Sequence, residues 1–65
     1  MSEARFTGMT TNERLWKAGL SDSFDLAARR QDRARMIDLL GKVELADQAE
    51  WIADTILSEP SRYGF

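Results

Sequence analysis

Cysteine and histidine are both absent from this chain of 65 residues. Without cysteine no disulfide can form, and without either residue type a structural zinc site has none of its usual ligands. A domain of this size buries a smaller share of its surface than a large one, so its hydrophobic core is thin. Close helix packing and self-association are the two remaining ways to support such a small fold.

Long apolar runs and signs of β-structure are missing as well. No run approaches the ~20 apolar residues that a membrane span needs, and the first ten residues show no apolar segment typical of a secretory signal. We therefore expect a cytoplasmic protein without membrane contact, which the lack of cysteine also fits. Sustained strand alternation and Asn-Gly or Asp-Gly hairpin turns are not found, so an all-α class is expected.

The residues that are present have a globular balance. Hydrophobic residues make up 43% and charged residues 31% of the chain, which differs from the composition of a disordered protein. The net charge of -2 argues mildly against a general nucleic-acid binder. We predict one small domain, a compact array of three to four short helices.

Punctuation residues predict where the first helix lies. Thr10 and Glu13 match a capping box, in which each side chain accepts a hydrogen bond from an unpaired backbone N–H at the helix start. Gly19 suits the left-handed position that closes a helix, with Leu15 and Leu20 placed for the apolar contact of a Schellman motif. These signals predict a helix over 11–18.

Two further helices are expected over 22–30 and 33–40. Ser21 or Asp22 is predicted to cap the first of them, and Asp32 the second. Gly41 is expected in the left-handed position after the second. Nothing in residues 30–32 forbids a continuous helix, but we favour a break there.

The last predicted helix begins near residue 46 or 47 and ends near residue 58. Its apolar face is regular, and Pro60 disfavours helical geometry at the preceding residue. We expect residues 1–9 to form a flexible extension, residues 10–60 the helical domain and residues 61–65 an irregular tail. The core is expected to contain at least one tryptophan together with Leu15, Leu20, Phe24, Met36, Ile37, Leu40, Val43, Leu45, Ile52 and Ile56.

Signs of catalytic chemistry are weak. Histidine and cysteine, the commonest acid–base group and the strongest common nucleophile, are missing, and the serines have no histidine partner. Asp47, Glu50 and Asp54 lie along one stripe that a hard divalent cation would accept, but a solvated face opposite the apolar one explains them better. We expect no enzyme activity, no metal and no cofactor.

The aromatic residues are the first candidates for partner binding. Trp16 and Trp51 each lie beside an apolar stripe, and we expect them to wall the core; if exposed, either would be a good interface anchor. Tyr63 and Phe65 follow Pro60 near the end of the chain. They either fold back over the core or present a short anchor for a partner, and the sequence leaves both alternatives open.

Charge is divided unevenly along the chain. Residues 29–42 hold five basic and two acidic residues, whereas residues 43–59 hold five acidic residues and no basic one. The basic cluster of Arg29, Arg30, Arg33 and Arg35 has two explanations. It forms ion pairs with the acidic last helix, or it neutralises nucleic-acid phosphates.

The sequence therefore favours a non-catalytic protein–protein interaction or regulatory module. Its partner is another protein or a second copy of the chain, with the basic segment of one copy facing the acidic helix of the other. The same charges can instead pair within one copy. Nucleic-acid binding through the arginines is the alternative; in a helix-turn-helix arrangement, however, the acidic helix would enter the major groove and be repelled by the phosphates.

Overall fold

The computed structural model describes residues 8–65, and in this part of the chain it contains helices and no strand. The prediction of an all-α fold is confirmed. None of the helices described is long and apolar enough to cross a membrane. The α-helices are α1 (Thr11–Lys17), α2 (Ser21–Arg29), α3 (Arg33–Lys42) and α4 (Ala49–Ser58), and the short 3-10 helices are η1 (Ala46–Gln48) and η2 (Pro60–Tyr63). Most of the extension expected over 1–9 lies outside the described residues.

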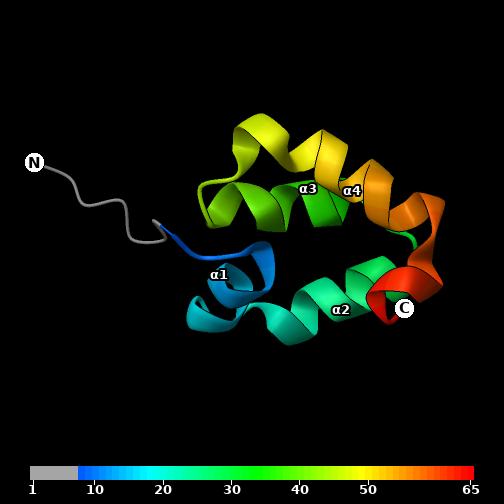
Figure 1. Cartoon of the computed structure of the whole chain (residues 1–65), viewed down its shortest axis with the longest axis horizontal. Coiled ribbons are helices and arrows are strands. Elements are labelled where there is room, and N and C mark those ends of the chain that lie inside the picture. The colour runs from blue at the N-terminus through cyan, green and yellow to red at the C-terminus, as the bar shows by residue number, and fades with distance from the viewer. Residues whose placement is uncertain (1–7) are drawn as a thin grey trace, which may run out of the picture.

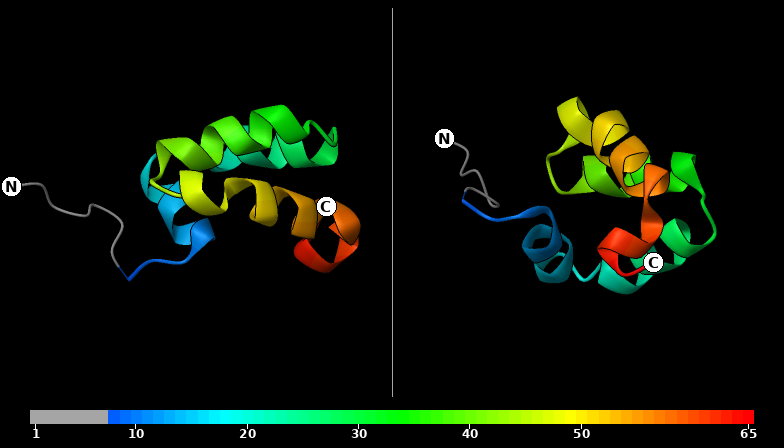
Figure 2. Two further views of the ribbon diagram at one scale, coloured as in Figure 1. Left: turned by 90° about the horizontal axis from the view of Figure 1, so that it is seen from above. Right: turned by 45° about the vertical axis from the view of Figure 1, so that its right-hand side comes forward.

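Helix α3 is the centre of the fold. It packs against α2 on one side and against η1 and α4 on another, while α1 adjoins α2 (Figure 1). Figure 1 and the right-hand view of Figure 2 show the α3–α4 pair and the α1–α2 pair as two layers. Because each helix is too short to be stable alone, the apolar face between these layers holds the fold together.

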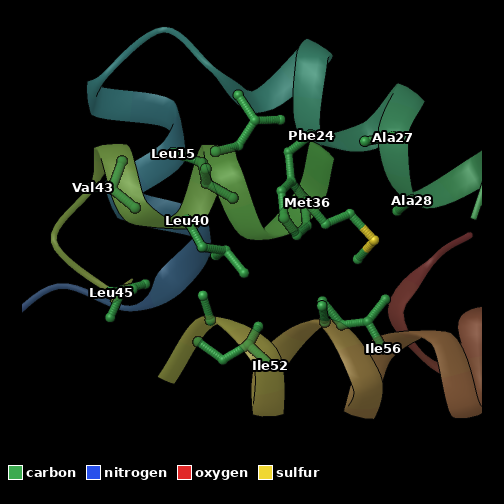
Figure 3. Close-up of a cluster of buried hydrophobic side chains, with 13 residues drawn as sticks. Leu15, Phe24, Ala27, Ala28, Met36, Leu40, Val43, Leu45, Ile52 and Ile56 are labelled. Atoms are coloured by element: carbon green, nitrogen blue, oxygen red, sulfur yellow. The ribbon is translucent and has the colours of Figure 1, made fainter. Parts of the chain in front are cut away.

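The core is formed by residues from all four α-helices and from the α3–α4 connection. Leu40 on α3 and Ile52 and Ile56 on α4 point toward one another between these two helices (Figure 3). The sequence prediction needs three corrections: Leu39 is fully buried, Leu20 and Ile37 are only half-buried, and neither tryptophan is buried. The buried set is Leu15, Phe24, Ala27, Ala28, Met36, Leu39, Leu40, Val43, Leu45, Ala49, Ile52, Ala53 and Ile56.

Helix α1 has the caps that the sequence predicts. The Glu13 backbone N–H donates to Thr10 Oγ1 at 3.2 Å, and the Thr10 N–H donates to Glu13 Oε1 at 2.8 Å. At the other end Gly19 has φ 74°, and the Leu20 N–H donates to the Leu15 carbonyl at 2.8 Å. This completes the Schellman motif and leads the chain directly into α2.

The junctions around α2 are only partly as predicted. The break between α2 and α3 is confirmed, and Asp32 caps α3 by accepting a hydrogen bond from the Arg35 N–H at 3.1 Å. The expected side-chain cap at Ser21 or Asp22 is wrong. Leu20 is the N-cap residue, and no side chain bonds to the first turn of α2. The tight turn at Gly19 places Ser21 already inside the helix, which explains the difference.

The end of α3 differs from the prediction more clearly. Gly41 is an ordinary helical residue, and α3 continues to Lys42. The left-handed position falls on Glu44, with φ 66°, and the Leu45 N–H closes the turn on the Leu40 carbonyl. Continuation of the helix brings Val43 to complete burial, and burying this side chain outweighs the local preference for ending at glycine.

This geometry predicts that Gly41→Ala stabilises the protein. A Cβ at residue 41 meets nothing within 4 Å, so the substitution removes glycine's excess unfolded-state freedom without a clash. We expect the free energy of unfolding to rise by about 0.5–1 kcal/mol. Urea denaturation followed by circular dichroism measures it. Gly19→Ala, at a positive φ, is the control and is expected to lower stability.

The end of the chain is more regular than expected. Instead of an irregular tail, residues 60–63 form η2, and Gly64 with φ 88° allows the Phe65 N–H to donate to the Pro60 carbonyl at 2.9 Å. Glu59 is non-helical, as Pro60 predicts. Pro60 then starts a new turn, because proline is well suited to the first position of a helix. The turn brings the chain end back beside α2 (Figure 1).

Candidate interaction surface

A shallow hollow of about 340 Å³ lies between the start of α1 and one side of α4. The buried side chains of Ile52 and Ile56 line it, and the exposed aromatics Trp51 and Tyr63 also border it. We call this surface the Trp51 groove; its lining residues are Thr10, Thr11, Asn12, Trp51, Ile52, Thr55, Ile56 and Tyr63. None of these eight side chains is charged, although 31% of the chain is.

The groove is uncharged because α4 has two different flanks. One flank carries Glu50 and Asp54, which lie near Arg33 of α3. The other carries Trp51 and Thr55, one helical turn apart, and it borders the groove. The side chain of Trp51 is 68% exposed. The expectation that this residue walls the core is therefore wrong, because its position on the flank of α4 directs the indole toward solvent.

Trp16 is also exposed, by 77%, but it belongs to a different surface. It borders a small hollow with Gly19, Ser21 and Asp22 at the α1–α2 turn. The expectation of a core position is wrong for this residue as well. The two tryptophans do not line a common hollow, so Trp16 offers a matched reference for Trp51.

The two aromatic residues near the chain end have different environments. Phe65 folds back over the core: its ring meets that of Phe24 edge-to-face at 6.5 Å, and the Arg29 guanidinium lies 5.8 Å from its centre. Tyr63 is 44% exposed and borders the Trp51 groove. Of the alternatives that the sequence left open, Phe65 takes the fold-back position, whereas Tyr63 is available at the surface.

The arginine cluster is divided among several contacts. Arg29 donates to the Gly64 carbonyl at 3.4 Å, Arg33 pairs with Asp54 on α4, and Arg35 pairs with Asp38 on its own helix at 3.0 Å. Arg30 borders another small hollow beside the half-exposed Leu26. These four side chains therefore do not present one continuous basic surface.

Arg33 connects the basic cluster to α4. Arg33 Nε donates to Asp54 Oδ1 at 2.7 Å, and a second nitrogen lies 3.9 Å from Glu50. The hydrogen bond from Arg33 and its charge lower the pKa of Asp54 below the ordinary 3.8. The same contact raises the pKa of Arg33. Through Arg33, the basic segment pairs with the acidic helix within one copy of the chain.

Asp54→Asn is expected to destabilise the protein modestly at neutral pH and not at all in acid. A carboxyl whose folded pKa is lowered stabilises the fold above its unfolded pKa, and this contribution disappears as pH falls through the folded value. Urea midpoints of wild type and variant should therefore differ at pH 7 and converge only as pH falls through the pKa of Asp54 in the folded protein, which lies below 3.8. High salt should reduce the difference, because both groups are solvated. Asp25→Asn, without an ion pair in the described structure, is the control.

Buried polar side chains and metal-binding clusters are not found in residues 8–65. No polar or charged residue is buried there, and no group of acidic side chains is arranged to hold a metal ion. The stripe of Asp47, Glu50 and Asp54 faces solvent, and two of its members lie beside Arg33.

Comparisons with protein-family models, curated proteins and solved structures find no match for this chain.

The sequence did not identify most of the groove. Of its eight lining residues only Trp51 and Tyr63 were among the predicted partner-binding residues; Thr10, Thr11, Asn12 and Thr55 were not. The helical periodicity of α4 indicates part of the groove. Both acidic residues of this helix fall on one flank, and Trp51 and Thr55 fall on the other. The contribution of α1 depends on how the helices pack, which local sequence does not encode.

Proposed function

We propose that this chain is a non-catalytic protein–protein interaction module that binds an apolar, uncharged surface of a partner protein in the Trp51 groove. The observation that carries this proposal is the exposure of Trp51, 68%, beside a hollow whose lining residues are all uncharged. Tryptophan is enriched among the residues that dominate binding energy, and charged residues are depleted at the centre of interfaces.

The size of the groove supports a protein partner over a cofactor. Its volume of about 340 Å³ lies at the lower end of the ~300–1,000 Å³ range of small-molecule pockets. It is open and shallow, and no charged side chain lines it to orient a polar ligand. It is well suited to one or two apolar side chains from another protein. We place this activity in the cytoplasm, with which the absence of cysteine is consistent.

Nucleic-acid binding through the arginine cluster has less support. Arg29 and Arg33 are directed at the chain end and at α4, and only Arg30 and Arg35 remain near each other, with Asp32 between them on the same hollow. Phosphate binding needs several cations along one path.

Site-specific photo-crosslinking in the cells that make this protein tests the proposal. A benzophenone-bearing phenylalanine derivative replaces Trp51 in one variant and Trp16 in the other. We expect a discrete crosslinked protein from position 51 and none from position 16, because both sites are exposed but only the first borders the groove. No adduct at position 51, or equal adducts at both positions, would contradict the proposed function.

A further inference from the structure

A second hollow, of about 210 Å³, lies between α2 and the start of α3 and shares no lining residue with the Trp51 groove. We call it the Arg30 hollow; its lining residues are Ser23, Leu26, Ala27, Arg30, Asp32 and Arg35. Unlike the groove, it combines apolar side chains with charged ones. Its chemistry therefore differs from that of the surface proposed to bind a partner protein.

The turn that joins α2 to α3 fixes the backbone around this hollow. Gln31 adopts the left-handed conformation with φ 56°, and the Asp32 N–H donates to the Ala27 carbonyl at 2.8 Å. This hydrogen bond closes the turn as in a Schellman motif. The turn sets Arg30 at the end of α2 close to Asp32 and Arg35 at the start of α3. The charged residues are thus brought together before a ligand arrives, which lowers the cost of binding one.

The two guanidinium groups at the hollow have donors to offer. The side chain of Arg30 makes no hydrogen bond or ion pair with any of residues 8–65. Arg35 pairs with Asp38 at 3.0 Å, but both side chains are about half exposed, so this pair is weak and leaves further N–H groups. Asp32 is held beside them because its carboxylate accepts the Arg35 backbone N–H. Two positive charges and one negative charge leave the lining with an excess of one positive charge.

The apolar part of the lining limits what the anion can be. Leu26 is 50% exposed at the hollow, and Ala27 is buried beside it. A ligand that covers Leu26 with an aliphatic group and places one negative charge at the arginines matches both parts. Inorganic phosphate has no apolar group, and its second charge would be repelled by Asp32. The hollow is also smaller than the ~300–1,000 Å³ pockets of drug-sized ligands, so the aliphatic group must be short.

We propose that the Arg30 hollow binds a carboxylate carried on a short aliphatic group. The carboxylate accepts hydrogen bonds from Arg30 and Arg35, and the aliphatic group covers Leu26. Hydrogen bonds between guanidinium and carboxylate are among the stronger ones in proteins, because both groups are charged. This chemistry is found in a free short-chain fatty acid and at the C-terminus of a protein that ends in an apolar residue. The site is independent of the Trp51 groove.

A chemical-shift titration of the full chain by two-dimensional ¹H–¹⁵N NMR tests this inference. Isovalerate represents the free acid and N-acetyl-leucine the chain end. We expect the amides of Leu26, Arg30 and Arg35 to shift with a dissociation constant on the order of 1–10 mM, at the weak end of the affinity scale. The tighter of the two probes identifies the source of the carboxylate. The amides of both probes lack the charge and acetate lacks the branched group, so all three should bind at least about fivefold more weakly.

Three variants assign the binding to the hollow. Arg30→Gln should weaken both acids at least about fivefold and keep the wild-type fold, because this side chain is exposed and has no partner among the described residues. Leu26→Ala should remove the preference for isovalerate over acetate. Arg62→Gln changes an exposed arginine outside the hollow and should bind as wild type does. Raising salt from about 0.05 M to about 0.5 M should weaken binding to wild type.

Four results would overturn the inference. They are the absence of shifts at about 50 mM of either acid, amides that bind as tightly as the acids, inorganic phosphate that binds more tightly than both acids, and wild-type affinity in Arg30→Gln. None of them affects the crosslinking result expected at position 51, since the two surfaces share no residue. The proposed function and this inference can therefore fail separately.

Discussion

Leu40→Ala is expected to lower the free energy of unfolding by about 3–5 kcal/mol, because it removes a leucine side chain from the centre of the core. Leu40 is completely buried in α3, the helix that packs against both α2 and α4. Its side chain points from α3 toward Ile52 of α4 (Figure 3). The substitution removes the buried surface of the leucine side chain. It also leaves a cavity that three short helices would have to close.

The size of this loss is decisive for so small a domain. A chain of this length has a total stability of roughly 3–10 kcal/mol, so the variant should be partly or largely unfolded at 37 °C. Urea and thermal denaturation, followed by circular dichroism, measure the change. Leu26→Ala is the control, because this leucine is 50% exposed and its loss should cost no more than about 0.5 kcal/mol. A Leu40→Ala variant with the wild-type midpoint would show that this core is not the main support of the fold.

Local signals in the sequence predict the elements of this fold well. The capping box of Thr10 and Glu13, the left-handed Gly19 and the N-cap Asp32 all occupy their predicted positions. Each of these signals acts over three to five residues, so the chemistry is complete within the segment that shows it. The same holds for Pro60, which ends α4 through its effect on the residue before it.

The ends of helices are predicted less well where a local signal competes with the burial of neighbouring side chains. Gly41 has every local reason to end α3, yet the helix continues and Glu44 adopts the strained left-handed conformation instead. That conformation costs a non-glycine residue about 1–2 kcal/mol. Burial of Val43 and Leu45 across the connection compensates for it, and their contacts come from other helices. The sequence shows the preference of glycine for ending a helix. It does not show the buried contacts with other helices that outweigh this preference.

The two tryptophans show the same limit for the candidate site. Both lie on the flank of an apolar stripe, where a small difference in helix orientation decides between core and surface. The core is instead filled by small and aliphatic residues, among them Ala49, Ala53 and Leu39. The alanines let α4 approach its neighbours closely, which leaves no space for an indole between the layers. The groove follows from this packing.

The sequence analysis does not single out Arg14, yet its side chain connects two parts of the fold. Its Nε donates to the Met9 carbonyl at 3.2 Å, and a terminal nitrogen donates to the Val43 carbonyl at 3.0 Å. It therefore joins the segment before α1 to the end of α3. The charge also suits its position, because carbonyls at a helix C-terminus carry partial negative charge. Helix α1 itself is only seven residues long, so it depends on such contacts.

Arg14→Met is expected to lower the free energy of unfolding by about 1.5–3 kcal/mol, the range for hydrogen bonds to a charged group. Methionine keeps an apolar stem of similar reach, so the loss reports mainly on the hydrogen bonds. Urea denaturation measures the change in the free energy of unfolding. Amide hydrogen exchange should be faster in α1 of the variant. Lys17→Met is the matched control, since Lys17 is an exposed cation in the same helix. If both variants behave alike, Arg14 does not anchor α1.

The same substitution links the fold to the proposed interface. Thr10, Thr11 and Asn12 border the Trp51 groove, and Arg14 holds the segment that carries them against the end of α3. With that anchor removed, this wall should become more mobile while the α4 residues stay in place. Arg14→Met should therefore reduce the yield of the crosslinked protein from position 51, although Arg14 is not one of the lining residues. Lys17→Met should leave that yield unchanged, and an unaltered yield in Arg14→Met would restrict the binding surface to α4 and η2.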